Sequence, residues 1–346
     1  MPDQSLQTLP TDDKYPKDRK VGLVFFGLIQ IALGGVLVLV ALFGALMTNL
    51  PTPGLDQTGT EGPPGSTLLM VAFFAPVAVM FVWLGVGSIM ARRWARSLSL
   101  VVGWLWLVGG VAGLLGLVFF LPLFSEGMRG VSAESAVSEE QAAMMVAMMK
   151  TFLIVFQSIF LVILPGTLVL FYRSKHVKAT CESRDSKVRW TDNRPLPVLA
   201  LSCLLGFGAY QSVVSGLSSF RMLPVFGTLI RGVPAVVLLF GIGLILVYLS
   251  RGIYRLDVRA WWAVVGLYIL ALISSTITFT RISPNEMLEA MQFPEGQSEL
   301  LPSNLLGGST MLLFMCIGGV VWLGFLWYVK RYFNEREVAA PGAGSG

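Results

Sequence analysis

Long apolar stretches separated by short polar segments dominate the hydropathy pattern of this chain. Eight of them reach the length of about 20 residues that a helix needs to cross a bilayer. All eight are continuously apolar and lack the alternation of a barrel strand. The pattern therefore predicts an all-α polytopic transmembrane bundle of eight spans. They run over Val21–Met47, Thr67–Met90, Ser97–Phe124, Thr151–Tyr172, Pro197–Ser219, Val233–Ser250, Ala260–Thr280 and Gly307–Val329.

Charge placement agrees with this interpretation. Hydrophobic residues make up 55% of the chain and charged residues only 13%. The 25 basic residues, the 20 acidic residues and the single histidine all fall outside the eight stretches. An ionisable side chain inside the bilayer usually marks an ion or proton pathway. Its absence from these stretches argues against proton- or sodium-coupled transport through a buried acidic site.

The basic residues also predict an orientation. Counted over the segments between the predicted spans, 20 of the 25 lie on one side, whereas ten acidic residues lie on each side. The positive-inside rule then places both termini in the cytoplasm. We expect a multi-pass protein of a bacterial cytoplasmic membrane, with the first span acting as a signal anchor. Basic residues spread over short loops indicate contact with anionic headgroups and not with nucleic acid.

The chain divides into two similar halves. We expect membrane halves at 21–172 and 197–330, a basic cytoplasmic linker at 173–196, and disordered tails at 1–20 and 331–346. Arg96–Gly103 matches Arg259–Gly266 at the arginine and at Val-Val-Gly. This predicts a 4+4 parallel internal repeat. The alternative is that similar residues simply recur at membrane boundaries.

Few polar residues lie within the predicted spans. They are candidates for a substrate path between the halves, or for hydrogen bonds between helices, which is the more common role. Gln211, Ser215 and Ser219 recur every four residues and so share one helix face. The substrate-path candidates are Gln30, Gln157, Tyr210, Gln211 and Ser215.

The linker offers a second candidate region. Arg184, Arg189, Trp190 and Asp192 are predicted to contact a partner or the lipid headgroups. A tryptophan flanked by arginines at an interface is most often a membrane anchor. Arg231, ahead of the sixth span, is expected to reach the outer interface.

No pattern of catalytic or metal-binding residues is recognisable. The sequence contains no phosphate-binding glycine loop, no nucleophile elbow and no carboxylate pair beside a base. His176 and Cys181 are too few for a zinc site. Met144, Met145, Met148 and Met149 carry the soft thioethers that suit Cu(I), but packing is the simpler explanation. We predict no catalytic residue, metal or cofactor.

The sequence therefore favours a non-enzymatic multi-pass membrane protein. It would be a membrane-embedded subunit or interaction protein that contacts the lipid bilayer and either another membrane protein or further copies of itself. The alternative is a carrier for a neutral or lipid-like substrate. The substrate-path residues would line its path.

Overall fold

The computed structural model is nearly all helical (86%) and describes residues 17–47, 66–133, 139–217, 222–282, 286 and 308–338. A π-helix, η1 (Ser158–Ile163), joins α4 to α5. The short elements are α6 (Lys175–Arg184), β1 (Met222–Val225) and β2 (Thr228–Arg231). The other helices are α1 (Lys20–Met47), α2 (Ser66–Ile89), α3 (Arg93–Ala133), α4 (Glu139–Gln157), α5 (Leu164–Arg173), α7 (Leu196–Leu217), α8 (Val233–Tyr254), α9 (Val258–Arg281) and α11 (Gly308–Val338).

Seven helical segments in the described residues are long and apolar enough to cross a membrane. They are α1, α2, α3, the continuous segment from α4 to α5, α7, α8 and α9. The chain is thus a multi-pass membrane protein. The eighth predicted span falls on α11, a helix of 31 residues that continues to Val338, beyond the start of the expected C-terminal tail. Residues 1–16 and 339–346 of the expected tails, and Ser219, lie outside the described residues.

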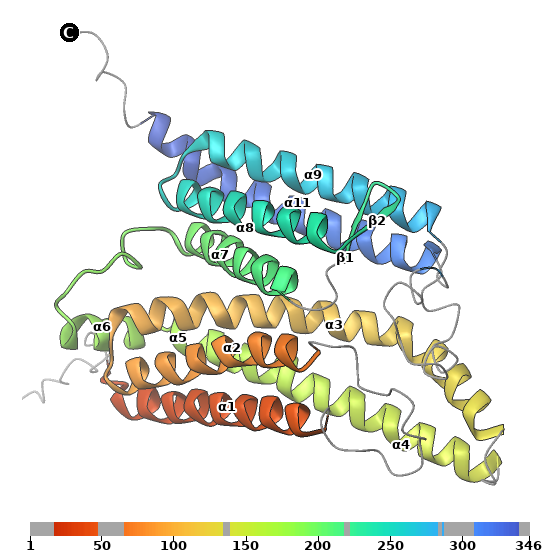
Figure 1. Cartoon of the computed structure of the whole chain (residues 1–346). Coiled ribbons are helices and arrows are strands. Elements are labelled where there is room, and N and C mark those ends of the chain that lie inside the picture. The colour runs from red at the N-terminus through yellow and green to blue at the C-terminus, as the bar shows by residue number, and fades with distance from the viewer. Residues whose placement is uncertain are drawn as a thin grey trace, which may run out of the picture.

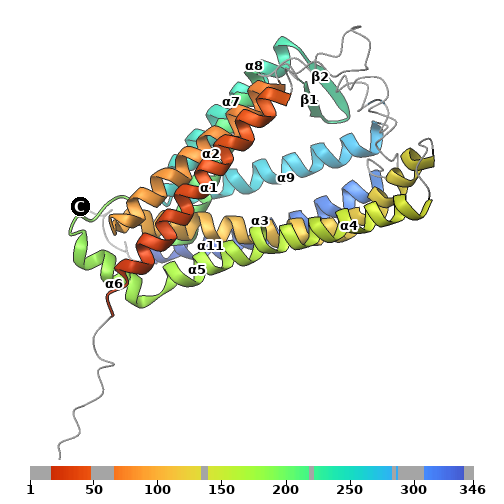
Figure 2. The same ribbon diagram turned by 90° about the horizontal axis from the view of Figure 1, so that it is seen from below.

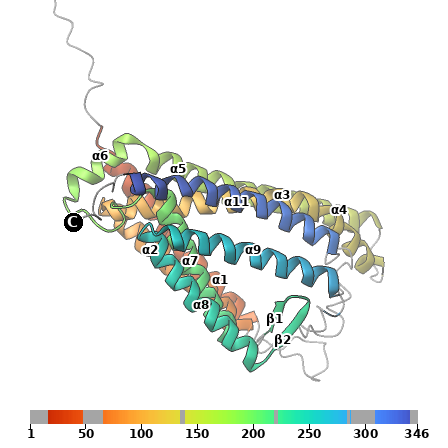
Figure 3. The same cartoon turned by 90° about the horizontal axis from the view of Figure 1, so that it is seen from above.

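The helices form two layers that converge where α6 lies and diverge toward the opposite end (Figures 2 and 3). Helices α1, α2, α7 and α8 follow one another in one layer (Figure 1), α4–α5, α3 and α11 form the other, and α9 lies between the two layers (Figures 2 and 3). Across the molecule, the helices of residues 20–173 lie at one side and those of residues 196–338 lie at the other. We refer to the two ends of the bundle as the α6 end and the hairpin end.

Helices α1 and α2 form a close antiparallel hairpin because glycine lies where they cross. A Cβ atom placed on Gly27 would lie 2.8 Å from the Gly85 carbonyl oxygen, and one on Gly85 would lie 2.5 Å from the Gly27 oxygen. Two turns along α1, a Cβ on Gly34 would lie 2.8 Å from the Ala78 oxygen. Small residues allow membrane helices to approach this closely.

Helices α7 and α8 form a second hairpin, with serine in place of glycine at one crossing point. Ser202 Oγ donates to the Ser250 carbonyl oxygen at 2.9 Å, and Ser250 Oγ donates to the Ser202 oxygen at 2.8 Å. Further along, a Cβ on Gly243 would lie 3.3 Å from the Ala209 oxygen. This hairpin is held by reciprocal hydrogen bonds as well as by close packing.

The α2–α3 and α8–α9 turns share one geometry. Each contains a non-glycine residue in the left-handed region, Ala91 at φ 52° and Leu256 at φ 62°. The next N–H donates to a carbonyl five residues back, at 2.9 Å to Gly87 and 3.0 Å to Gly252. This is the Schellman motif, which satisfies the last carbonyls of a helix. The left-handed conformation costs an L-residue about 1–2 kcal/mol.

A β-hairpin that the sequence analysis did not predict precedes α8. Its two-residue turn, Phe226 at φ 48° and Gly227 at φ 81°, has the positive φ angles of a type I′ turn. The tip lies against α9, where the backbone N–H groups of Phe226 and Gly227 donate to Ser274 Oγ at 3.0 Å and Thr278 Oγ1 at 3.1 Å. Arg231 ends β2 and lies outside the apolar helix α8.

The two parts of the bundle have separate cores and meet through α7. Buried residues of α7, α8, α9 and α11 form one apolar cluster, and buried residues of α1, α3, α5 and α6 contribute to another. Between them, α3 packs its Val101 against Leu199 and Ala200 of α7. Nearer the hairpin end, Tyr210 Oη of α7 donates to the Ala72 carbonyl of α2 at 2.7 Å. Helix α7 therefore contacts both α2 and α3.

Candidate functional site

The linker after α5 is an ordered structure that closes the α6 end. Its helix α6 buries Val177, Thr180 and Cys181 against the bundle. The N-terminal segment crosses it, since the Lys17 N–H donates to His176 Nδ1 at 3.2 Å and the Arg19 N–H donates to Thr180 Oγ1 at 3.1 Å.

An ion pair at the surface reinforces this crossing. Arg184 donates to the Asp18 carboxylate at 2.8 Å, and this hydrogen bond lowers the pKa of Asp18. Arg184, predicted to contact a partner or headgroups, therefore has an intramolecular partner in the described residues and remains 40% exposed.

Asp185 caps helix α3 from the linker. Its carboxylate is 2% exposed and accepts from the Arg93 N–H at 3.3 Å and the Lys187 N–H at 3.4 Å, with Arg92 Nη1 3.7 Å away. An acceptor at this position satisfies one of the unpaired N–H groups of the first helical turn. Helix α9 uses its own Asp257 instead, which accepts from the Arg259 N–H at 2.9 Å.

Asp192 stabilises the turn that follows. Its two carboxylate oxygens accept from Ser97 Oγ of α3 at 3.5 Å and from the Arg189 N–H at 3.1 Å. The predicted contact residue Asp192 thus holds the linker against α3. Trp190 lies at the other side of the turn, where its carbonyl accepts from Tyr254 Oη at 3.0 Å. The linker consequently joins both parts of the bundle.

The same turn contains polar atoms that are buried without a partner. In the described residues Arg189 Nε, Thr191 Oγ1 and Arg194 Nε have no hydrogen-bond partner, although Thr191 is only 2% exposed. A buried polar group left unpaired costs about 1–3 kcal/mol. Next to these atoms, Val188 is 64% exposed and Trp190 is 48% exposed. The turn combines unpaired donors with exposed apolar side chains.

A buried polar network lies beneath the linker. Gln30 Nε2 donates to Ser99 Oγ at 3.0 Å, and Gln30 Oε1 accepts from Ser88 Oγ at 3.3 Å and Tyr172 Oη at 3.4 Å. The Ser88 and Tyr172 hydroxyls are 2.7 Å apart. Four helices, α1, α2, α3 and α5, each contribute one side chain. The Arg96 Nε–H group donates to the Tyr172 carbonyl at 3.1 Å, which connects the network to the entrance of α3.

The other substrate-path candidates lie apart from this network. Gln157 packs over α3, since a Cβ on Gly113 would lie 2.9 Å from its Nε2. Gln211 belongs to α7, and its buried Oε1 has no partner in the described residues. Tyr210 bonds to α2 as described above, and Ser215 lies one turn beyond Gln211 on α7. The hydrogen bonds seen in the described residues do not join the three glutamines.

In the described residues, no group of three or more His, Cys, Asp or Glu side chains is placed to hold a metal ion. Cys181 is buried, and desolvation raises the pKa of its thiol to about 11. Met144, Met145 and Met148 are exposed on α4.

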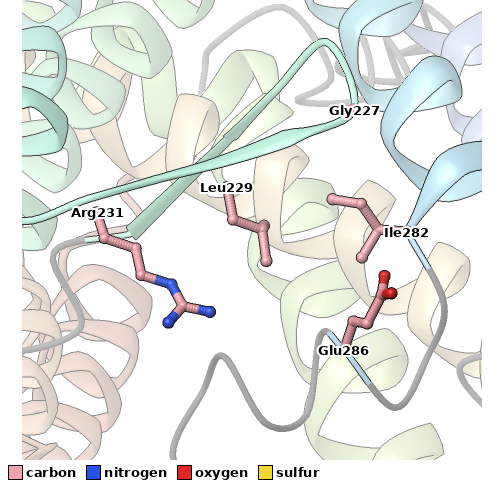
Figure 4. Close-up of a pocket in the computed structure, with 5 residues that line it drawn as sticks. All are labelled: Gly227, Leu229, Arg231, Ile282 and Glu286. Atoms are coloured by element: carbon pink, nitrogen blue, oxygen red, sulfur yellow. The ribbon is translucent and has the colours of Figure 1, made fainter.

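A pocket of about 330 Å³ lies at the hairpin end, between β2 and the end of α9 (Figure 4). Figure 4 shows Arg231 and Glu286 on opposite sides of it. Gly227, Leu229 and Ile282 complete the lining. The pocket contains none of the predicted substrate-path residues.

Comparisons with known proteins assign no family to this chain. No family model, no curated protein and no solved structure matches it. The function has to be inferred from the site itself.

Proposed function

We propose that the chain is an eight-span membrane protein with both termini in the cytoplasm and α11 as its last span. The support is the length of α11 and the distribution of basic residues, which gather at the α6 end. The linker then lies on the cytoplasmic face and the β-hairpin on the opposite face.

The two halves are proposed to be a parallel duplication. The support is the register of their helix crossings. One constant spacing along the chain relates the crossing residues of α2 to those of α8. It relates Gly85 to Ser250 and Ala78 to Gly243. It also relates the turn residues Ala91 and Leu256, which share their left-handed conformation.

Helices α1 and α7 agree with this register. A second constant spacing relates the crossing residues of α1 to those of α7. It relates Gly27 to Ser202 and Gly34 to Ala209. The spacing that relates Ala91 to Leu256, which we call the register of the turns, relates Arg96 to Trp261. The sequence match instead pairs Arg96 with Arg259, two residues away.

Under the proposed duplication, the polar network of the first half has no counterpart in the second half. The counterparts of Gln30, Ser88 and Ser99 are Leu205, Ile253 and Val264, and all three belong to the apolar core of the second half. The network thus lies where the second half has three apolar core residues, and it holds four helices together. Since Gln30 bonds within its own half, it supports a structural role more than the carrier alternative.

The proposed function is that of a non-catalytic membrane-embedded subunit, which binds a protein partner through the linker turn 187–194. The single observation that carries this is the pair of exposed apolar side chains, Val188 and Trp190, in a turn that also contains the half-buried arginines Arg189 and Arg194. A partner with acidic or carbonyl oxygens would pair with the accessible parts of the Arg189 and Arg194 guanidinium groups, and would cover Val188 and Trp190. Deeply packed aromatic and arginine residues commonly dominate such interfaces.

Site-specific photo-crosslinking in native membranes tests the proposal. A photoreactive residue at position 190 should give an adduct with one discrete polypeptide. The matched controls are position 177, buried under α6, and position 320, exposed on α11, where the same adduct should be missing. Lipid adducts alone at position 190, or equal protein adducts at all three positions, would contradict it.

A further inference from the structure

The way the two halves meet leaves one edge of the molecule on α1 and another on α8 and α9. The helices of the first half lie at one side of the molecule and those of the second half at the other, so α1 lies at one side and α8 and α9 at the other (Figure 1). A two-fold axis between the halves would pair α3 with α7 and equally α9 with α1. Instead α7 contacts α2 and α3, while α9 and α1 lie on opposite sides. The contact between the halves is therefore heterologous.

The contacts on the α3 side of this interface have counterparts on α9. The α3 residues that pack toward α7 are Leu98, Val101 and Leu105. In the register of the turns they correspond to Ala263, Gly266 and Leu270. These three residues are exposed, and nothing lies within 4 Å of a Cβ placed on Gly266. This face of α9 is apolar and uncovered by the chain.

The contacts on the α7 side have counterparts on α1. Leu199, Ala200 and Cys203 of α7 correspond to Val24, Phe25 and Leu28 of α1. Phe25 is 59% exposed and Leu28 is 56% exposed.

A second pair of positions gives the same result nearer the hairpin end. Tyr210 and Ala72, which are hydrogen-bonded across the interface, correspond to Gly35 of α1 and Val237 of α8. Val237 is 64% exposed, and nothing lies within 4 Å of a Cβ on Gly35. Both edges thus carry the counterparts of an interface that the chain already forms internally.

We infer that a second copy of this chain docks its α1 edge against the α8–α9 edge of the first. The inference rests on the proposed duplication, and the occupant follows from continuity with the internal interface. Because the contact is heterologous, repeating it gives a ring if the rotation closes and an open array if it does not. The partner of this surface is the chain itself, distinct from the partner proposed for the linker turn.

Disulfide crosslinking of the full chain in lipid membranes tests the docking. With Cys203 and Cys316 replaced by alanine, F25C and G266C in one chain should give dimers and higher species on mild oxidation. The control pair, F25C with V320C on the exposed face of α11, should give at least tenfold less.

A blocking substitution separates docking from folding. Nothing in the described residues lies within 4 Å of a Cβ placed on Gly266 or on Gly318 of α11, so Gly266→Trp is paired with Gly318→Trp as its matched control. In lipid nanodiscs, native mass spectrometry should show oligomers for the parent and for Gly318→Trp, and at least a tenfold smaller oligomer fraction for Gly266→Trp.

Monomers throughout, or oligomers that Gly266→Trp leaves intact, would overturn the inference. A monomeric chain that still crosslinks a different polypeptide at position 190 would overturn only the self-docking and leave the proposed subunit function standing.

Discussion

At the scale of single residues, a hydrogen-bond network centred on Gln30 joins four helices of the first half. Gln30 is 1% exposed and has partners on three other helices. The sequence pointed to Gln30 but not to Ser88, Ser99 or Tyr172. Serines inside spans are common, and which of them meet depends on packing between helices that are distant in sequence. Hydropathy reports only that a segment is apolar.

Gln30→Leu should lower the free energy of unfolding by about 1–3 kcal/mol, because the buried hydroxyl groups of Ser99 and Tyr172 lose their hydrogen bonds to Gln30. Unfolding in a graded series of denaturing detergent measures this. Adding Ser88→Ile, Ser99→Val and Tyr172→Phe should recover part of the loss, since the result copies the second-half core at three positions. A combined variant less stable than Gln30→Leu would count against the correspondence between the halves.

Cys181 should react slowly with alkylating reagents. Because the folded protein raises the pKa of its thiol from the ordinary 9.0 to about 11, the thiolate fraction at pH 8 falls about 100-fold. In a chain with Cys203 and Cys316 replaced by alanine, alkylation followed by mass spectrometry should be at least that much slower than in the unfolded protein. The rate should rise about tenfold per pH unit up to pH 11. Equal rates in the folded and unfolded states would show that α6 does not bury this thiol.

At the scale of elements, hydropathy predicted the membrane helices well and the short elements poorly. Each of the first seven predicted spans coincides with a helical segment of membrane length. The β-hairpin at 222–231 lies in residues 220–232, a segment between two predicted spans that is too short and too weakly apolar for hydropathy to assign a structure to it. Phe226-Gly227 between apolar residues was the available signal. Helix α6 was missed because its amphipathic pattern is short and its stability comes from packing on the bundle.

Capping of α3 by Asp185 gives a local prediction. Asp185→Ala should destabilise the protein by about 1 kcal/mol and should speed hydrogen exchange in the first turn of α3. Asp257→Ala is the matched control, because it should affect the first turn of α9 and leave α3 unchanged. Faster exchange of α9 in the Asp185 variant would contradict this assignment.

The close crossing of α1 and α2 gives a prediction about stability. Gly27→Ala should lower the free energy of unfolding by about 1–3 kcal/mol, because the added methyl group meets the α2 backbone. Gly35→Ala, on the same helix with nothing within 4 Å, should raise it by up to about 1 kcal/mol. Unfolding of the two variants in detergent compares them directly, and the same sign for both would contradict the crossing geometry.

At the scale of the whole molecule, the two halves lie side by side in the same sense, and the linker closes the α6 end between them. The sequence suggested the repeat from its boundaries. It did not reveal how the halves meet, because an interface between apolar helices has the same composition as a surface that faces lipid. The contact of α7 with α3 is what defines the edges on α1 and α9.

The number of spans is the central claim and has a direct test. Accessible tags fused to each terminus, probed from both sides of sealed membrane vesicles, report the side on which each end lies. Eight spans predict that both tags face the cytoplasm, whereas seven predict tags on opposite sides. Tags on opposite sides would contradict the paired four-span halves, and with them the proposed orientation of the linker.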